Sequence, residues 1–137
     1  MSAMSTYLEN ALVNHVLRNT AYTTPGTTVY VGLIKYYDAA VVEAGTLTQE
    51  IGTGGSTAYN RVQVTSWDAP SDGATQNTGA ITFPTATGDW GGISGVIIAD
   101  HATAGNILLH GSLTSARDVK NGDVFKFNAG DLDITFA

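Results

Sequence analysis

Apolar side chains recur at helical spacing in one segment, near the start of the chain. At positions i, i+3, i+4, i+7 and i+8 they form a stripe with one polar member, made of Leu8, Ala11, Leu12, His15 and Val16. Thr6 and Glu9 are three residues apart, the spacing of a capping box that would satisfy two amide donors of the first turn. The pattern predicts a helix over residues 6–18, followed by turn residues at 23–26.

From residue 28 onward the apolar positions have a period of two, which is typical of strands. In the first of these segments, 28–36, Val31 and Leu33 would share one face and Ile34 would lie on the other. Because both faces are apolar, we expect a central strand that is covered on both sides, with the helix on one of them. The other predicted strands are 47–51, 61–67, 80–83, 93–100, 106–113, 117–120, 124–127 and 132–136.

Turn signals between these strands predict two hairpins. The strands 93–100 and 106–113 flank a loop that contains Gly105. Asn121-Gly122, a pair that tolerates positive φ, would join 117–120 to 124–127. One helix followed by many short strands indicates a mostly β protein, an antiparallel β-sandwich or jelly-roll-like domain with one N-terminal α-helix.

Composition supports this interpretation. The chain has 137 residues, a length that suits a single domain over 1–137, with the sandwich at 28–136. It is rich in Thr, which favours strands, and its 16 glycines supply the positive φ of tight turns. Charged residues make up only 13% of the chain and apolar residues 43%, so the composition is that of a folded protein.

Charge and cysteine content exclude several function classes. The net charge is −6 and no two basic residues are adjacent, which argues against direct binding of nucleic acid or of an anionic membrane surface. There is no cysteine, so disulfides and cysteine-based zinc sites are excluded. No apolar run approaches the roughly 18 residues of a membrane span. We expect synthesis in the cytoplasm, without secretion through a cleaved signal and without membrane insertion.

Residues that could carry chemistry are few. His15 lies on the helix stripe and is expected to be a half-buried structural residue. Asp100 and His101 begin a loop, where adjacent strand residues would point to opposite faces, and a two-histidine site of His101 with His110 would lack a third ligand. The pair Asp131 and Asp133 could bind a hard cation or serve in glycoside hydrolysis. The stronger interpretation is that both are solvated carboxylates, opposite a buried face of Leu132, Ile134 and Phe136.

The glycine-rich segment 52–56 contains no lysine and does not match a phosphate-binding loop. No nucleophile elbow is present either. We therefore predict no catalytic, metal-binding or cofactor-binding residues. Exposed aromatic side chains are common at protein–protein contacts, and Tyr36, Tyr37 and Trp67 are the interface candidates that the sequence offers.

Several strings of the chain resemble one family, the short proteins of tailed bacteriophages that are usually labelled phage tail fibre protein. The resemblance extends over nearly the whole chain, through 8–18, 21–25, 29–33, 59–61, 67–73, 81–91, 105–111 and 128–134. Residues 81–91, Ile-Thr-Phe-Pro-Thr-Ala-Thr-Gly-Asp-Trp-Gly, are the most specific part. The chain departs from the family pattern in a variable loop over 37–58, so any partner specificity carried there does not transfer.

The resemblance implies a non-enzymatic structural protein of the virion. A fibre usually has a shaft, and this chain has no heptads or repeats, so we expect a capsid cement (decoration) protein on the capsid surface. It would be a homotrimer that contacts the major capsid protein. The alternative is a tail fibre or tail-tip component that contacts tail proteins or a host receptor. An enzyme, such as a cell-wall depolymerase, would rest only on the scattered His and Asp residues.

Overall fold

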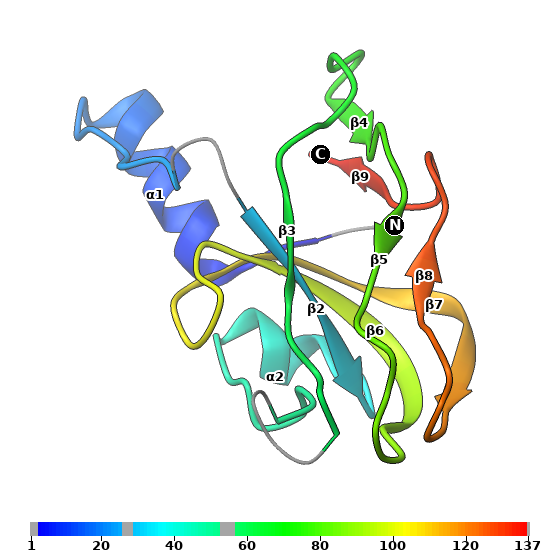
Figure 1. Ribbon diagram of the computed structural model, residues 1–137. Helices are drawn as coiled ribbons and strands as arrows, with labels where there is room; N and C mark the ends of the chain where they lie inside the picture. Colours follow the sequence, from blue (N-terminus) through cyan, green and yellow to red (C-terminus); the bar gives the residue numbers. More distant parts are fainter. Residues whose placement is uncertain (1–2, 26–28, 53–56, 137) are drawn as a thin grey trace.

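The computed structural model describes residues 3–25, 29–52 and 57–136, and its largest element is an antiparallel sheet (Figure 1). In spatial order the five strands of this sheet are β1 (Ala3–Met4), β7 (Ile107–Val119), β6 (Gly91–Ala99), β2 (Val29–Lys35) and β3 (Val62–Val64). The predicted hairpin of 93–100 with 106–113 is confirmed, because β6 and β7 pair along most of their length. The expected central strand is also confirmed, since β2 lies between β6 and β3.

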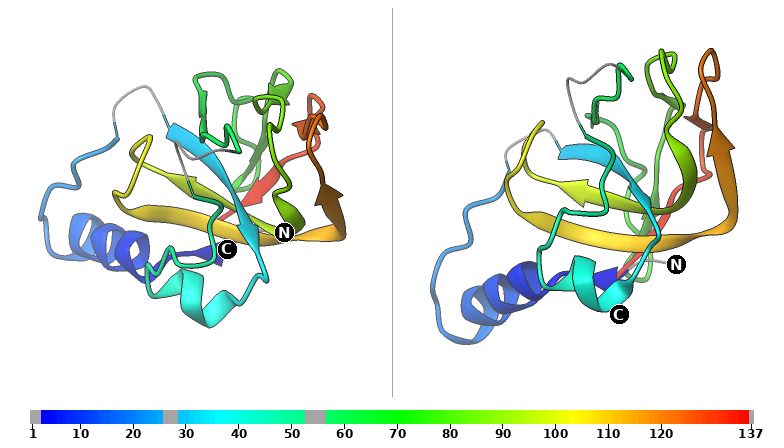
Figure 2. Two further views of the ribbon diagram at one scale, coloured as in Figure 1. Left: turned by 60° about the horizontal axis from the view of Figure 1, so that its bottom comes forward. Right: turned by 90° about the horizontal axis from the view of Figure 1, so that it is seen from below.

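Two small ribbons lie over one face of this sheet, and the helices lie on its other side (Figure 2). One ribbon pairs β4 (Ala74–Gln76) with β9 (Asp133–Thr135), and the other pairs β5 (Ile81–Thr82) with β8 (Lys126–Phe127). All pairings are antiparallel. The protein is therefore mostly β and sandwich-like, with one long helix near its N-terminus, as the sequence pattern predicts.

The main core fills the space between the large sheet and the ribbons. Val31 and Leu33 of β2 point into it, and Phe83, Phe125 and Phe127 form an aromatic cluster beneath the ribbons. The T-shaped contacts in this cluster, with ring centroids 5.1–6.5 Å apart, suit the quadrupoles of the rings. The core is thus built from the inward positions of the period-two pattern.

The second face of the sheet carries a smaller core under α2 (Ala39–Glu43). Ile34, Val42, Ile97 and Ile107 are buried together there. Asp38 caps this helix by accepting a hydrogen bond from the amide of Ala40 at 3.0 Å. Both faces of β2 are covered as predicted, but α2, which the sequence pattern did not reveal, covers the second face around Ile34.

The helix predicted over 6–18 is present as α1 (Thr6–Leu17), and it projects beyond the sheet (Figures 1 and 2). Its N-cap is Ser5 and not Thr6, because Ser5 Oγ accepts a hydrogen bond from the amide of Leu8 at 3.2 Å. Ser5 Oγ also donates to the carbonyl of Ile107, which joins the helix start to β7. Only Leu8 of α1 is buried, so the helix is anchored by its first turn and not along a stripe.

The predicted hairpin at Asn121-Gly122 is wrong, although the turn itself exists, with Gly122 at a φ of 91°. The strand after the turn, β8, pairs with β5 through Phe127 and Ile81. Of the segment 117–120, the first three residues are the end of the 13-residue β7 and pair with the start of β6. Pairing β8 with β5 places Phe125 and Phe127 against Phe83, and this burial outweighs the local turn preference.

Three other differences concern short elements. The sequence pattern did not reveal β1 or β4, which have two and three residues. Of the predicted strand 47–51, only an isolated bridge between Glu50 and Ile34 is present. The predicted turn at 23–26 and the glycine-rich segment 52–56 fall partly on residues 26 and 53–56, which lie outside the described residues. Within the described part of the chain, no helix has the length and apolar character needed to cross a membrane.

Candidate functional site

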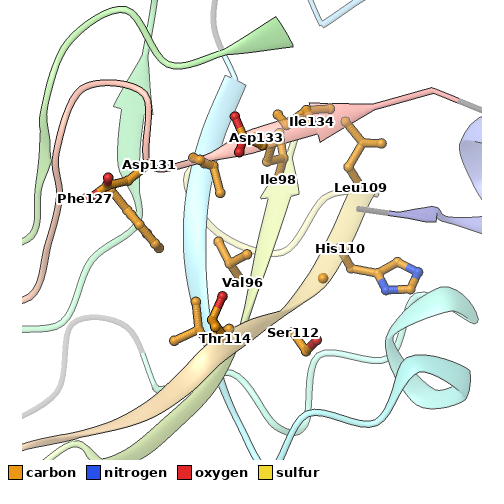
Figure 3. A pocket seen from close by; sticks show the side chains of 13 residues that line it. Val96, Ile98, Leu109, His110, Ser112, Thr114, Phe127, Asp131, Asp133 and Ile134 are labelled. Atoms are coloured by element: carbon orange, nitrogen blue, oxygen red, sulfur yellow. The ribbon is translucent and has the colours of Figure 1, made fainter. Parts of the chain in front are cut away.

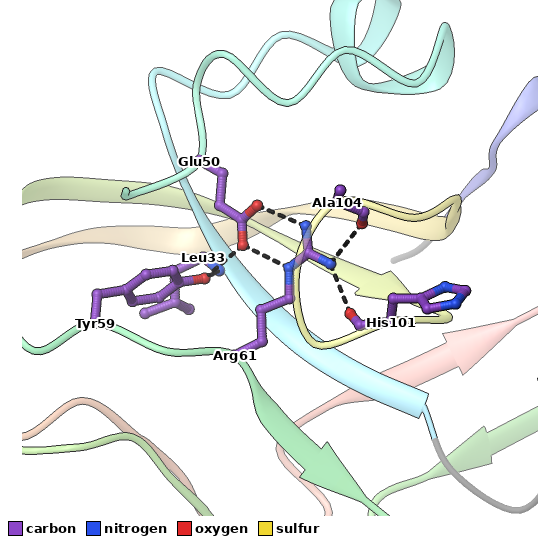
Figure 4. A network of polar contacts seen from close by, with 6 residues as sticks. All are labelled: Leu33, Glu50, Tyr59, Arg61, His101 and Ala104. Carbon is purple, nitrogen blue, oxygen red and sulfur yellow. Dashed lines mark hydrogen bonds and ion pairs between the residues drawn. The ribbon is translucent and has the colours of Figure 1, made fainter. Parts of the chain in front are cut away.

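A buried polar network joins the large sheet to the loop after β6 (Figure 4). Arg61 donates from Nε to Glu50 Oε1 and from Nη2 to Glu50 Oε2, both at 2.7 Å. The third nitrogen, Nη1, donates to the carbonyl of His101 at 2.7 Å and to that of Ala104 at 2.9 Å. The side chains of Arg61 and Glu50 are 1% and 8% exposed, so this is a buried, bidentate ion pair.

Tyr59 completes the network from the side of β2. Its hydroxyl donates to Glu50 Oε1 at 2.9 Å and accepts from the amide of Leu33 at 2.8 Å. Burial and then the charge of Glu50 raise the pKa of Tyr59, so the phenol stays protonated. Burial opposes the charged form of Arg61, but its hydrogen bonds to Glu50 and the charge of Glu50 outweigh this and raise its pKa. The phenol of Tyr59 and the guanidinium of Arg61 therefore both keep their protons near neutral pH, and we name the network of Glu50, Tyr59 and Arg61 the clamp.

The network also explains a glycine in the middle of β2. A Cβ on Gly32 would lie 2.8 Å from Glu50 Oε1 and 3.0 Å from the hydroxyl of Tyr59. Such a contact is too short for a carbon atom, so a larger residue would displace the carboxylate or the phenol. Each polar side-chain atom of the clamp thus bonds either backbone or another side chain of the clamp.

A second buried polar pair lies on the α2 side of the sheet. Tyr37 Oη and His110 Nδ1 are hydrogen-bonded at 2.8 Å, and His110 is only 2% exposed. Burial lowers the pKa of His110, partly offset by the negative charges of Glu43 and Glu9. His110 is therefore neutral at pH 7, and its role is to hold Tyr37 against the sheet.

A recess opens between β7 and β9, and two carboxylates stand at its edge (Figure 3). Its volume is about 150 Å³, with Val96, Leu109 and Ile134 among its lining residues. Asp131 and Asp133 are exposed and Leu132 and Ile134 are buried, which confirms the predicted alternation at these four positions, but Phe136, which was expected on the buried face, is 44% exposed. Among the described residues, no three His, Cys, Asp or Glu side chains are close enough to hold a metal ion. The recess thus combines apolar lining residues with two carboxylates.

The interface candidates Tyr36, Tyr37 and Trp67 have three different surroundings. Tyr36 is 77% exposed and has a φ of 51°, so the chain turns it out into solvent. Tyr37 is half-buried, because its hydroxyl bonds His110 and its amide donates to Ser94 Oγ at 2.7 Å. Trp67 is half-buried and packs against the main core. The structure does not bring these three aromatic side chains together.

The remaining histidines do not meet each other. His15 is exposed, not half-buried as predicted, and its Nδ1 accepts from the amide of Tyr22 at 3.3 Å. The side chain of His101 contacts its neighbour, with Nδ1 2.6 Å from Asp100 Oδ1. The expectation that Asp100 and His101 point apart is therefore wrong, because both belong to a loop and not to a strand. His110 bonds Tyr37 instead of approaching His101.

The surface feature that sequence reasoning missed lies on α1. Val13, Val16 and Leu17 are 52%, 73% and 78% exposed, and their i, i+3, i+4 spacing places them on one face of the helix. We name these three residues the α1 arm. The signal in the sequence is that apolar residues surround the second half of the helix and do not form one stripe, so they cannot all face a single core.

Comparison with known proteins now adds to this geometry. No curated protein matches the chain. A family model described as "Podophage GP4 fiber I protein gp80" matches residues 3–135, which is nearly the whole chain. The match covers the clamp, the recess and the α1 arm alike. The chain therefore belongs to the podophage GP4 fibre I protein gp80 family, and it is a fibre-type structural protein of a phage virion.

Proposed function

We propose that the chain is a non-enzymatic subunit of the virion that acts through protein–protein contacts alone. The observation that carries this proposal is the use of its buried polar groups. Glu50, Tyr59 and Arg61 bond one another and the backbone, and His110 bonds Tyr37. The polar atoms of Glu50, Tyr59 and Arg61 are occupied by one another and by backbone, so these three groups are not free to act as a nucleophile, base or acid. What the described surface offers instead is exposed apolar side chains and carboxylates.

One placement of this subunit is in a tail fibre. The description of the matched family names a fibre, which supports this placement. The chain would then contact tail proteins at one surface and either a further fibre segment or a host receptor at another. The exposed Tyr36 and the recess beside Asp131 and Asp133 are surfaces suited to such contacts.

The other placement is on the capsid, as a cement protein bound to the major capsid protein. The shape of the described part supports it, because the sheet and its two ribbons form a compact block without a long shaft (Figure 2). A rigid block that bridges neighbouring capsid proteins would raise the free energy needed to separate them. A homotrimer would match the local threefold positions of a capsid lattice.

Electron microscopy of virions that carry a tagged copy of the chain tests the placement. Gold label on the tail alone supports the fibre component and rejects the cement protein. Label distributed over the capsid supports the cement protein and rejects the fibre component. Absence of label from purified particles that contain all other structural proteins would contradict the whole proposal.

The non-enzymatic part needs a separate test. We expect that a variant with His101→Ala, Asp131→Asn and Asp133→Asn folds like the original chain, since none of these side chains is buried. The measurement is release of sugars or peptides from host cell walls by the purified original chain and by the purified variant, with circular dichroism to confirm that both are folded. Turnover by the original chain that this well-folded variant lacks would revive the enzyme hypothesis.

A further inference from the structure

The α1 arm is an apolar surface without a partner in its own chain. Val13, Val16 and Leu17 are more than half exposed, whereas Leu8 at the other end of the helix is 4% exposed. A soluble chain tolerates single exposed apolar residues, but three on one face of a projecting helix are typical of a contact surface. The arm is therefore suited to insertion into a groove of another molecule.

The same chain carries such a groove. A depression of about 270 Å³ lies beside α1, with Leu12, Tyr22, Trp67 and Phe136 among its lining residues. Apart from Thr75, its lining consists of apolar and aromatic residues, and Phe136 is 44% exposed. We name this hollow the α1 groove. It shares Ile98, Leu109 and Ile134 with the recess beside Asp131 and Asp133, so the groove and the recess adjoin each other.

The charge distribution favours a second copy of the chain as the occupant of the groove. No acidic residue occurs between Asn10 and Tyr37, where the basic residues are Arg18 and Lys35. The 12 acidic residues of the chain all lie outside this segment, and the net charge of the protein is −6. Two copies therefore repel each other over most of their surfaces, and the arm is the region that a neighbouring copy can accept.

Arg18 sharpens this complementarity. It follows Leu17 directly at the end of α1, and one of its nitrogens donates to Asn14 Oδ1 at 3.1 Å, which leaves other donors of the guanidinium for a partner. An arm seated in the groove of a neighbour would bring Arg18 toward the edge that holds Asp131 and Asp133. The apolar side chains of the arm would then enter the α1 groove, and the guanidinium of Arg18 would approach the two carboxylates.

The two possible geometries differ in the apolar surface that they cover. Pairing the arm with the same three residues of a second α1 helix would leave the apolar α1 groove of both copies open. In a head-to-tail arrangement each copy uses its arm on one neighbour and its groove on the other. Every copy then covers two separate surfaces, and a suitable rotation closes the arrangement into a ring.

We propose that the α1 arm of one copy binds the α1 groove of the next copy, and that this head-to-tail contact assembles the protein into a closed homo-oligomer. The proposal does not depend on whether the particle carries the protein on its tail or its capsid. It assigns the contact to Val13, Val16, Leu17 and Arg18 on one copy and to Trp67, Phe136, Asp131 and Asp133 on the other.

Mass measurement of purified variants by sedimentation equilibrium tests the contact. The original chain should form an oligomer of fixed size, larger than a dimer. Leu17→Asp in the arm and Phe136→Asp in the groove should each raise the dissociation constant at least about tenfold, as for a central interface residue. Val124→Asp is the matched control, since Val124 is 51% exposed and lies outside both surfaces, and it should change nothing.

A mixing experiment distinguishes head-to-tail contact from pairing of two α1 helices. Leu17→Asp retains its groove and Phe136→Asp retains its arm, so an equal mixture should form heterodimers and nothing larger. Circular dichroism and thermal melting confirm that each variant is folded, and Trp67→Ala replaces Phe136→Asp if the latter is not. A monomeric original chain, an unchanged mass of the groove variant, or a mixture that stays monomeric would each overturn the proposal.

Discussion

The clamp of Glu50, Tyr59 and Arg61 and the α1 arm differ in how their side chains are used. In the clamp, five hydrogen bonds from two side chains end on Glu50 or on backbone carbonyls, and the ion pair is almost completely buried. In the arm, Val16 and Leu17 remain more than 70% exposed. The comparison shows that these buried polar groups stabilise the fold, whereas the apolar side chains of the arm remain exposed to solvent.

This difference predicts where substitutions affect stability and where they affect assembly. A change in the clamp should lower the free energy of unfolding and leave the contact surfaces intact in whatever fraction remains folded. A change in the arm should alter the oligomeric state of a fully stable protein. The following variants test this division, beginning with the largest expected effect.

Removing Arg61 should have the largest effect. Arg61→Ala leaves Glu50 buried without its counter-ion and two carbonyls without a donor, so the free energy of unfolding should fall by about 3–5 kcal/mol. Denaturant unfolding monitored by tryptophan fluorescence measures it. The double variant Arg61→Met with Glu50→Gln should lose less, because no unpaired charge is left behind. Equal losses in both variants would show that the charge of Glu50 does not matter.

Two leucines of α1 provide the next comparison. Leu8→Ala should cost about 2–5 kcal/mol, because Leu8 is buried at the anchored first turn. Leu17→Ala should stay within about 0.5 kcal/mol, because Leu17 is 78% exposed in the single chain. Thermal unfolding at a low protein concentration measures both. Equal destabilisation would mean that the second half of α1 is packed and not projecting.

Gly32 tests the clamp by steric means. Gly32→Ala places a methyl group against Glu50 and Tyr59 and should cost about 1–3 kcal/mol. Gly92→Ala is the matched control in the same sheet, because a Cβ there meets no atom within 4 Å. Chemical denaturation of the two variants side by side gives the difference. A loss in Gly92→Ala as large as in Gly32→Ala would exclude the steric explanation.

The smallest expected effect concerns pH. Burial lowers the pKa of His110 below its ordinary value of 6.5, so below that pH the unfolded chain binds a proton that the folded protein does not. Stability should therefore be complete above pH 6.5 and fall as the pH decreases from there, before the carboxylates titrate. Unfolding curves from pH 7.5 to 5 measure the slope. His110→Gln should remove this slope, and an unchanged slope would assign it to another group.

The sequence predicted the regular parts of the fold and the polarity of single positions. Strands such as β2 and β6 were found because Val31, Leu33 and their counterparts alternate over a long segment. The wet face of Asp131 and Asp133 followed from the same period. The clamp could not be predicted, because Glu50 and Arg61 lie in irregular segments and only the tertiary fold brings them 2.7 Å apart.

The errors share a cause, which is that local signals compete with distant contacts. Asn121-Gly122 does form a turn, but the chain after the turn does not pair back with β7, because Phe125 and Phe127 pack against Phe83. Thr6 has the spacing of a cap, but Ser5 takes that role because its hydroxyl can also reach Ile107 across the sheet. In both cases burial and long-range hydrogen bonds outweigh a preference of a few residues.

By itself, the sequence determined the class of this protein: the period of its apolar residues made it β-rich, and its charge and lack of cysteine restricted what it could bind. The tertiary structure alone decided which side chains are buried and bonded to partners and which remain exposed to solvent. Periodicity reports the face on which a residue lies, because it reflects local backbone geometry. Whether that face is covered depends on the arrangement of distant segments, and this is why the exposed α1 arm and the α1 groove became visible only in the folded chain.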